Sequence, residues 1–264
     1  QKKHKNTKRI VMTSIGTGYD LSCTTFSPDG RVFQVEYATK AVENHSSTAI
    51  GLRCTDGIVI AVENIITSKM LEKGANERIH PLSRELGLAS SGVRADASQL
   101  VLRARQEASA YKSSRGVDIP IQVLADRVAL FVQTFTLYSS VRPFGCSVIL
   151  GGIDKKGPAL FVVEPIGIAY GYKGAAVGKG ATAAKTEMEK LNFEELTCAQ
   201  AVKEAARIIH TIHDDVKEKE FTLEMSWMTT QTKHFEAVPD ELLHQAEADA
   251  KQTLEAMDSD DDEL

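Results

Sequence analysis

The stretch "TTFSPDGRVFQVEYATKAVEN", residues 24–44, predicts a tight turn followed directly by an amphipathic helix. Within the turn, Pro28 fixes φ, the Asp29 side chain can bond the backbone that follows it, and Gly30 accepts a positive φ. The helix should dock on the rest of the protein through one apolar face. That face consists of Val35, Ala38, Ala41 and Val42. A rigid turn and a helix therefore precede the first β-rich segment.

Beyond this stretch, the chain contains several short runs of β-branched and apolar residues that are typical of strands. The first two runs are joined by Thr55-Asp56-Gly57, and Asp-Gly supplies the positive φ that a tight hairpin turn requires. Two antiparallel strands therefore follow each other directly. The predicted strands cover residues 47–54, 57–64, 86–92, 145–154, 158–165, 167–178 and 221–228.

Helices are predicted in pairs between groups of strands, because apolar residues recur there at helical spacing. The pairs cover residues 93–114 with 120–140 and 181–190 with 198–217, and a last helix covers 239–257. Consecutive hairpins separated by helix pairs do not fit a parallel sheet, in which strands and helices alternate singly. The strand runs are apolar on both faces, as expected where a sheet lies between another sheet and helices. The sequence predicts an α+β fold, a four-layer αββα sandwich of two antiparallel sheets.

The composition is typical of a globular domain, with 264 residues of which 42% are hydrophobic and 25% are charged. The net charge of −5 gives no electrostatic reason to expect nucleic acid or a membrane as a partner. The four cysteines are far apart and form no C-x-x-C pair, so no metal site, cofactor or disulfide framework is predicted. No apolar run reaches the roughly 18 to 20 residues of a bilayer span. We expect a reducing compartment, the cytoplasm and nucleus.

Both ends of the chain differ from the middle, because the first residues are basic and the last are acidic. We expect a disordered basic extension (1–13), one domain (14–257) made of an N-terminal segment (14–45) and a sandwich (46–257), and an acidic tail (258–264). Ser259, which three aspartates follow, is a candidate phosphorylation site for an acidophilic kinase. The alternative is a tail whose charge only keeps the protein soluble.

Three motifs carry a resemblance to a known family. They are Tyr19-Asp20, the segment from Phe26 to Arg31 with Gln34 to Ala38, and "VRPFG", residues 141–145. Together they resemble proteasome core α subunits, over about residues 14–257. The resemblance implies the N-terminal-nucleophile hydrolase fold, which is the same four-layer sandwich. It also implies a place in an outer heptameric ring that gates substrate access and docks activators in ubiquitin-dependent protein degradation.

The partners that the resemblance implies are the other α subunits of a hetero-heptameric ring, β-ring subunits, and regulatory or activator particles. The resemblance also implies a cluster of residues near the N-terminus that holds the N-terminal tails of neighbouring subunits upright when the channel opens. Its positions here are Tyr19, Asp20, Pro28 and Tyr37. The family often has Arg after Tyr-Asp, whereas this chain has Leu21, so its tail should pair differently with its neighbour. On the residues alone, the alternative is a helix cap with surface aromatics.

A second implied site is the pocket between adjacent α subunits, where a Lys in a Glu-Lys-Ile context pairs with the C-terminal carboxylate of an activator. This sequence reads Glu77-Arg78-Ile79. Arg78 keeps the charge and can donate two parallel hydrogen bonds, but its planar head needs a different approach. We expect the pocket beside this chain to accept activator tails weakly or selectively. The alternative is a surface Arg without a functional role.

The active β subunits of this family use an N-terminal Thr whose own amino group is the base, aided by an Asp and a Lys. Alignment of the hairpin places Ser47 and Thr48 near the nucleophile, Glu63 at the Asp, and Arg78 at or next to the Lys. Ser47 is internal, and Arg stays protonated, so it cannot share protons as Lys does. We therefore predict no catalytic residue. The alternative is an active N-terminal-nucleophile hydrolase after processing near Ser47 or Thr48.

Three further features are interpreted as structural. The stretch "GAAVGKG", residues 174–180, differs in spacing from a phosphate-binding loop, so a strand-to-helix turn is predicted. His210 and His213 lie three apart on a predicted helix, and without a third ligand we favour surface or interface histidines over a metal site. Trp227 alternates as a strand residue would and is predicted to belong to the core.

Overall fold

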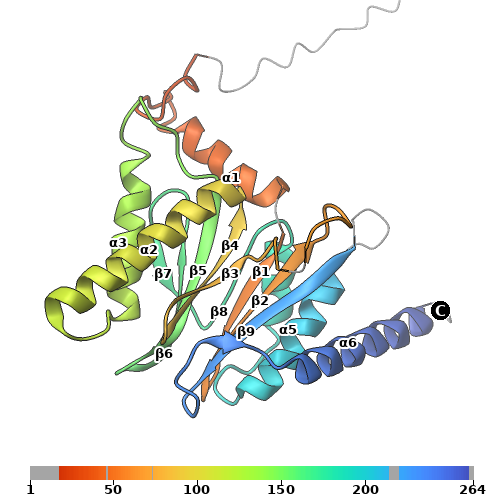
Figure 1. Ribbon diagram of the computed structural model, residues 1–264. Helices are drawn as coiled ribbons and strands as arrows, with labels where there is room; N and C mark the ends of the chain where they lie inside the picture. Colours follow the sequence, from red (N-terminus) through yellow and green to blue (C-terminus); the bar gives the residue numbers. More distant parts are fainter. Residues whose placement is uncertain (1–17, 46, 73, 214–219, 262–264) are drawn as a thin grey trace, which may run out of the picture.

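The computed structural model describes residues 18–45, 47–72, 74–213 and 220–261. In this part of the chain, the layers follow one another in the order helices, sheet, sheet, helices (Figure 1). The predicted four-layer αββα sandwich is confirmed. The predicted basic extension, residues 1–13, lies outside the described residues. Of the described helices, none combines the length and apolarity that a bilayer span requires.

Within the described residues, each sheet has five strands, and neighbouring strands are antiparallel. The first sheet contains β1 (Ala49–Arg53), β2 (Gly57–Ile65), β8 (Gly174–Val177), β9 (Phe221–Thr229) and β10 (Glu236–Ala237), in the order β10-β9-β2-β1-β8. The second contains β3 (Ile79–Ser83), β4 (Leu86–Gly92), β5 (Cys146–Asp154), β6 (Gly157–Val163) and β7 (Ala169–Gly171), in the order β3-β4-β5-β6-β7.

Helices form the two outer layers (Figure 1). The helices α2 (Arg94–Arg115) and α3 (Ile121–Thr134) pack on the second sheet. On the first sheet lie α4 (Ala181–Met188), α5 (Cys198–Ile212) and α6 (Asp240–Asp261), whereas α1 (Phe33–His45) lies across one end of the sandwich. The start of α5 has a capping box, in which Thr197 and Gln200 each bond the other's backbone N–H.

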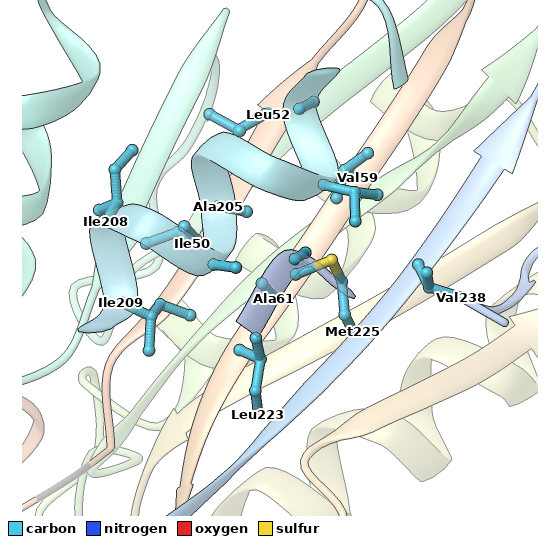
Figure 2. Close-up of a cluster of buried hydrophobic side chains, with 14 of the residues drawn as sticks. Ile50, Leu52, Val59, Ala61, Ala205, Ile208, Ile209, Leu223, Met225 and Val238 are labelled. Carbon is cyan, nitrogen blue, oxygen red and sulfur yellow. The ribbon is translucent and has the colours of Figure 1, made fainter. Parts of the chain in front are cut away.

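Strand β2 shows why the strand sequences are apolar on both faces. Its residues Val59 and Ala61 pack in the core between the first sheet and α5, which Figure 2 shows. The residues that alternate with them, Ile58 and Ile60, point the other way, into the core between the two sheets. A third core fills the space between the second sheet and its helices. Three buried layers of side chains therefore separate the four layers of backbone.

The two sheets approach each other closely because glycines face large side chains between them. A Cβ atom on Gly51 of β1 would lie 2.9 Å from Leu160 Cδ1. A Cβ atom on Gly151 of β5 would lie 2.7 Å from Ile58 Cδ1. Larger residues at these two positions would push the sheets apart or displace large core side chains.

The prediction was wrong at several element boundaries. It missed β10 and β3; β3 is an edge strand that contains Pro81 and a register shift. Residues 167–178 form two strands rather than one, because the chain leaves the second sheet after β7 and enters the first at β8. The helix α3 ends at Thr134, so the following residues form a loop. The helix α6 continues past Met257 to Asp261.

Candidate functional site

The turn before α1 is closed by Ser27 rather than by Asp29. The Ser27 hydroxyl accepts a hydrogen bond from the Arg31 N–H (3.1 Å), and the Ser27 carbonyl accepts one from the Gly30 N–H (2.9 Å). As predicted, Gly30 has a positive φ, 74°, which glycine adopts at little cost. Asp29 is exposed, so the sequence assigned the side-chain bond to the wrong residue. The prediction of a rigid turn nevertheless agrees with these bonds.

Helix α1 docks on the body through the predicted face. Its members are Ala38 and Val42, which are buried, and Val35 and Ala41, which are partly buried. Phe33, at the start of the helix, is also buried. The Arg31 guanidinium lies 4.8 Å from the centroid of the Phe33 ring and forms a two-point ion pair with Glu36. These contacts tie the turn to the first turn of the helix.

Hydrogen bonds to two different elements hold the residues that precede the turn. The buried Cys23 thiol donates to the Tyr138 carbonyl (3.0 Å), in the loop that follows α3. The Gln34 side-chain amide of α1 donates to the Asp20 carbonyl. The described part of the N-terminal segment, residues 18–45, is thus attached both to its own helix and to the loop after α3.

The second motif, residues 141–145, fixes this loop to the start of α2. Arg142 donates to both carboxylate oxygens of Asp96, at 2.6 and 2.8 Å, and the Gly145 N–H donates to the same carboxylate at 2.9 Å. Burial by itself would raise the pKa of Asp96, but the hydrogen bonds from Arg142 and Gly145 outweigh it and lower that pKa below its ordinary value. Asp96 therefore carries its charge at neutral pH and holds the loop.

The same motif anchors the loop to the end of α3 through an aromatic contact. The buried Phe144 ring lies 4.5 Å from the Phe135 ring and 5.7 Å from the Phe131 ring, between centroids. The loop whose Tyr138 carbonyl accepts the Cys23 thiol is therefore attached both to α2 and to the end of α3.

Of the four residues predicted to form ring contacts, the structure joins two. The Tyr37 hydroxyl donates to the Asp20 carboxylate at 3.3 Å. Desolvation, followed by the Asp20 charge, raises the pKa of Tyr37, so the phenol stays a donor at neutral pH. Tyr19 and Pro28 are exposed. Leu21, at the position where the family often has Arg, is 90% exposed.

Large apolar side chains gather on the N-terminal segment and on the loop that it contacts. The exposed ones are Tyr19, Leu21, Phe26, Tyr37, Leu137, Tyr138 and Val141. Exposed apolar side chains that lie close together are typical of surfaces that another protein covers. This end of the sandwich therefore has the character of a protein contact surface.

The residue Thr48 is buried, and its polar groups are hydrogen-bonded. Its N–H donates to Glu63 (3.1 Å), and its hydroxyl accepts from the Gly180 N–H (3.0 Å). Thr48 is only 1% exposed. The neighbouring Ser47 carbonyl accepts from the Ser91 hydroxyl at 2.5 Å. The structure thus brings Thr48 and Glu63 together, as the alignment predicted, but without a free amine.

Glu63 has a partner that the sequence did not indicate. Its second carboxylate oxygen lies 2.6 Å from His213 Nδ1, at the end of α5. The side chains of Glu63 and His213 are only 4% and 2% exposed. The prediction of a surface or interface His213 was therefore wrong, because the fold brings this residue onto Glu63 of β2. The fold places His213 beside a carboxylate whose other oxygen already binds Thr48.

Arg78 is half-buried at the start of β3. One of its terminal nitrogens donates to the Gly92 carbonyl (3.1 Å), and within the described residues its buried Nε has no hydrogen-bond partner. Burial, followed by repulsion from Arg94, lowers the pKa of Arg78. Its backbone N–H and that of Ile79 both donate to Glu224 of β9. If Arg78 formed two parallel hydrogen bonds with an activator carboxylate, these would compete with its bond to the Gly92 carbonyl. The pocket role of Arg78 stays a prediction.

Two residues near Arg78 were missed by the sequence reasoning. Glu224 fixes the backbone of Arg78, as described above, and burial raises the pKa of its carboxyl group. Arg94 donates to the Asn76 side chain (2.6 Å) and to the Ala75 carbonyl (2.5 Å) in the preceding loop. Neither residue belongs to a motif, and only the contact between distant elements identifies them.

Family comparisons identify the same regions of the chain. A family model described as "Proteasome subunit" matches residues 43–228, and a model of the N-terminal signature of A-type proteasome subunits matches residues 19–41. The chain belongs to the proteasome α-subunit family. The signature coincides with the N-terminal segment, and the larger match with most of the sandwich.

Curated relatives extend this result over nearly the whole chain. Proteasome subunit alpha type-3 of Spinacia oleracea is 56% identical over 250 residues, which are 94% of this chain and 100% of the relative. The protein of the same name from Acanthamoeba castellanii is 58% identical, over 92% of this chain and 96% of the relative. That from Drosophila melanogaster is 46% identical, over 89% and 93%. The chain is an α-type subunit of the proteasome core complex, which acts in protein degradation.

In this α-type subunit, the remaining motifs have structural roles. The stretch 174–180 forms β8 and the turn into α4, as predicted, and Gly178 in it has a φ of 107°. Trp227 packs against the core between the first sheet and its helices, which confirms its prediction. Ser259 lies near the end of α6, and its phosphorylation stays a prediction.

Proposed function

We propose that this proteasome subunit is non-catalytic and acts through contacts with other chains. It forms part of the outer hetero-heptameric ring with other α subunits, contacts β-ring subunits, gates substrate access and docks regulatory or activator particles. The observation that carries this proposal is the contrast between Thr48, which is buried, and the N-terminal segment, which carries exposed apolar side chains. The cytoplasm and nucleus, where proteasomes would meet their substrates, are the proposed locations.

The arrangement around Thr48 argues against hydrolysis. An N-terminal nucleophile needs a free α-amino group as its base, whereas the Thr48 nitrogen is a peptide N–H that donates to Glu63. The Thr48 hydroxyl is buried and accepts the Gly180 N–H, so it is not open to a substrate. The alternative, an active N-terminal-nucleophile hydrolase, would require cleavage before Ser47 or Thr48 and removal of the N-terminal segment.

The N-terminal segment supports the gating part of the proposal. Tyr19, Asp20, Pro28 and Tyr37 lie on a segment whose base is tied to α1 and to the loop after α3. The segment therefore has a fixed base from Gly18 onward. Leu21 offers an apolar contact in place of the charged one that the family often has, so the neighbouring subunit should present an apolar surface there.

The test compares assembled particles that carry the unmodified chain, Thr48→Ala or Thr48→Ser. Thr48→Ala removes the hydroxyl, whereas Thr48→Ser keeps both the hydroxyl and the acceptor for Gly180. We expect equal peptide hydrolysis per particle in all three, and an intact mass that includes the N-terminal segment. Loss of hydrolysis in Thr48→Ala alone, at unchanged assembly, would contradict the proposal, as would a chain that begins at Ser47 or Thr48.

A further inference from the structure

The turn between β1 and β2 and the start of α5 bring together three groups that can bind a metal ion. The Sγ atoms of Cys54 and Cys198 and a carboxylate oxygen of Asp56 all lie within 4.8 Å of one another. Both cysteines are buried free thiols, and Asp56 is partly exposed. Because Cys54 and Cys198 are far apart in the sequence, cysteine spacing could not indicate this cluster.

Backbone contacts fix these three residues relative to one another. The Asp56 side chain accepts the Cys198 N–H at 2.8 Å, at the first residue of α5. The Thr55 N–H donates to the Leu196 carbonyl (2.9 Å), and the Asp56 carbonyl accepts the Thr230 N–H (2.7 Å). The turn is therefore bound to α5 and to the end of β9 before any ion is present. The Asp56 carboxylate is also a hydrogen-bond partner of the Cys198 thiol, and an ion would replace the proton of that bond.

We infer that Cys54, Asp56 and Cys198 form a binding site for Zn²⁺, a property that lies beyond the ring and gating functions. Thiolates are the protein ligands that select zinc, and a carboxylate oxygen commonly completes such a set. In a tetrahedral zinc site with Zn–S distances of about 2.3 Å, two sulfur atoms lie roughly 3.8 Å apart. The three groups therefore need to move together by no more than about 1 Å. Because Asp56 is partly exposed, a water molecule is the expected fourth ligand.

Charge favours a cation at this point. When Zn²⁺ binds, each sulfur forms a bond to the ion, and the two thiol protons pass to solvent. The ion offsets the charges of two thiolates and one carboxylate. It also links the β1–β2 turn to the helix α5.

The competing interpretation is that Cys54 and Cys198 are only small apolar side chains of the core, in which both are packed. The full chain, treated with a chelator and kept reduced, distinguishes the two. We expect it to take up one equivalent of Zn²⁺ in competition with a chromophoric chelator. Cd²⁺, as a probe, should give the near-ultraviolet absorption of a thiolate–metal bond. A chain without one-to-one uptake, or without that absorption, would overturn the inference.

Variants then assign the site. Cys54→Ala and Cys198→Ala should each weaken Zn²⁺ binding by more than the roughly 10–100-fold that loss of an outer partner of a metal ligand costs. Asp56→Asn keeps an acceptor for the Cys198 N–H but should also bind Zn²⁺ more weakly. Cys146→Ala, which removes a buried thiol elsewhere, is the control and should bind normally.

Thermal unfolding provides a readout that does not depend on the chelator. Zn²⁺ should raise the melting temperature of the unmodified chain and of Cys146→Ala, but not that of Cys198→Ala, because only a folded state with the site binds the ion. Equal uptake and equal thermal shifts in the chain that lacks both Cys54 and Cys198 would show that Zn²⁺ binds to other surface groups only, and would overturn the inference.

Discussion

The Thr48 region and the N-terminal segment are built in opposite ways. Around Thr48, the backbone N–H, the hydroxyl, and the carboxylate of Glu63 are buried and hydrogen-bonded to one another or to neighbouring strands and helices. The N-terminal segment has few polar attachments and presents Leu21 and Phe26 to the surface. Substitutions in the first region should therefore lower stability, whereas those in the second should change contacts with other chains.

Glu63→Ala should have the largest effect on stability. It removes the acceptor of the Thr48 N–H and the buried carboxylate that contacts His213, which should reduce the free energy of unfolding by about 3 kcal/mol. Urea unfolding of the purified chain measures this. Glu194→Ala breaks the exposed pair with Lys173 and is the control, with an expected loss of less than about 1 kcal/mol. Equal losses would show that the Thr48 region does not depend on buried hydrogen bonds.

Gly178→Ala tests the close packing over Ser47. A Cβ atom at Gly178 would lie 2.3 Å from the Ser47 carbonyl oxygen, in a residue whose φ is 107°. The expected loss of unfolding free energy is about 2–3 kcal/mol. Gly157→Ala is a matched control, because Gly157 has a φ of 108° but nothing within 4 Å of its Cβ position. It should lose only about 1 kcal/mol from backbone strain. If both variants lost the same amount, strain alone would account for Gly178.

Asp96→Asn tests the loop that receives the N-terminal segment and should depend on pH. Loss of the charged acceptor for Arg142 should reduce the unfolding free energy by about 1–2 kcal/mol at neutral pH. Because the pKa of Asp96 is lowered in the folded state, its stabilisation is present above the unfolded pKa and is lost as pH falls through the folded pKa. The difference from the unmodified chain should therefore shrink below about pH 4.

Urea unfolding at a series of pH values measures this difference for Asp96→Asn. The matched control is Asp118→Asn, which removes an exposed partner of Lys112 and should change stability by less than about 0.5 kcal/mol. A deficit in Asp96→Asn that stayed constant down to acid pH would show that the charge of Asp96 does not fix the loop.

Arg78 lies between the two kinds of region, since its side chain is half-buried but its predicted role is binding. Arg78→Lys replaces the planar guanidinium with a smaller ammonium group. It should strengthen binding of activator-tail peptides to assembled particles by about tenfold or less. Arg78→Ala should weaken any remaining binding. Labelled tail peptides measure both. Identical affinity and occupancy for the unmodified chain and both variants would exclude Arg78 from the pocket.

Tyr37→Phe should have the smallest effect on the isolated chain. It removes one exposed hydrogen bond of 3.3 Å, so stability should change by less than about 0.5 kcal/mol. In assembled particles, activator-stimulated peptide hydrolysis should fall, because Tyr37 and Asp20 belong to the proposed gate. Tyr172→Phe is the control, since Tyr172 is as exposed as Tyr37, at 38% each, but lies outside the N-terminal segment. A stability loss above about 1 kcal/mol would assign Tyr37 a structural role instead.

Local signals allowed much of the fold to be predicted. The Asp-Gly turn between β1 and β2, the paired helices, and strands that are apolar on both faces are short-range features, and together they indicate two sheets between helices. The same reasoning failed for β7 and β8, because a run of strand-forming residues carries no information on which sheet it joins. It also failed for β3, whose Pro81 and irregular pairing are tolerated only at a sheet edge.

The turn and helix of the N-terminal segment, the four layers and the family could be predicted from the sequence, because each depends on residues that are adjacent or regularly spaced. The folded chain was needed to see that Ser27 closes the turn, that His213 lies against Glu63, and that Cys54 lies close to Cys198. The last two contacts join β-strand residues or their turn to α5. Such pairings depend on how α5 packs on the first sheet. The hydrophobic periodicity of the helix or of a strand does not specify which residues of the other element it will contact.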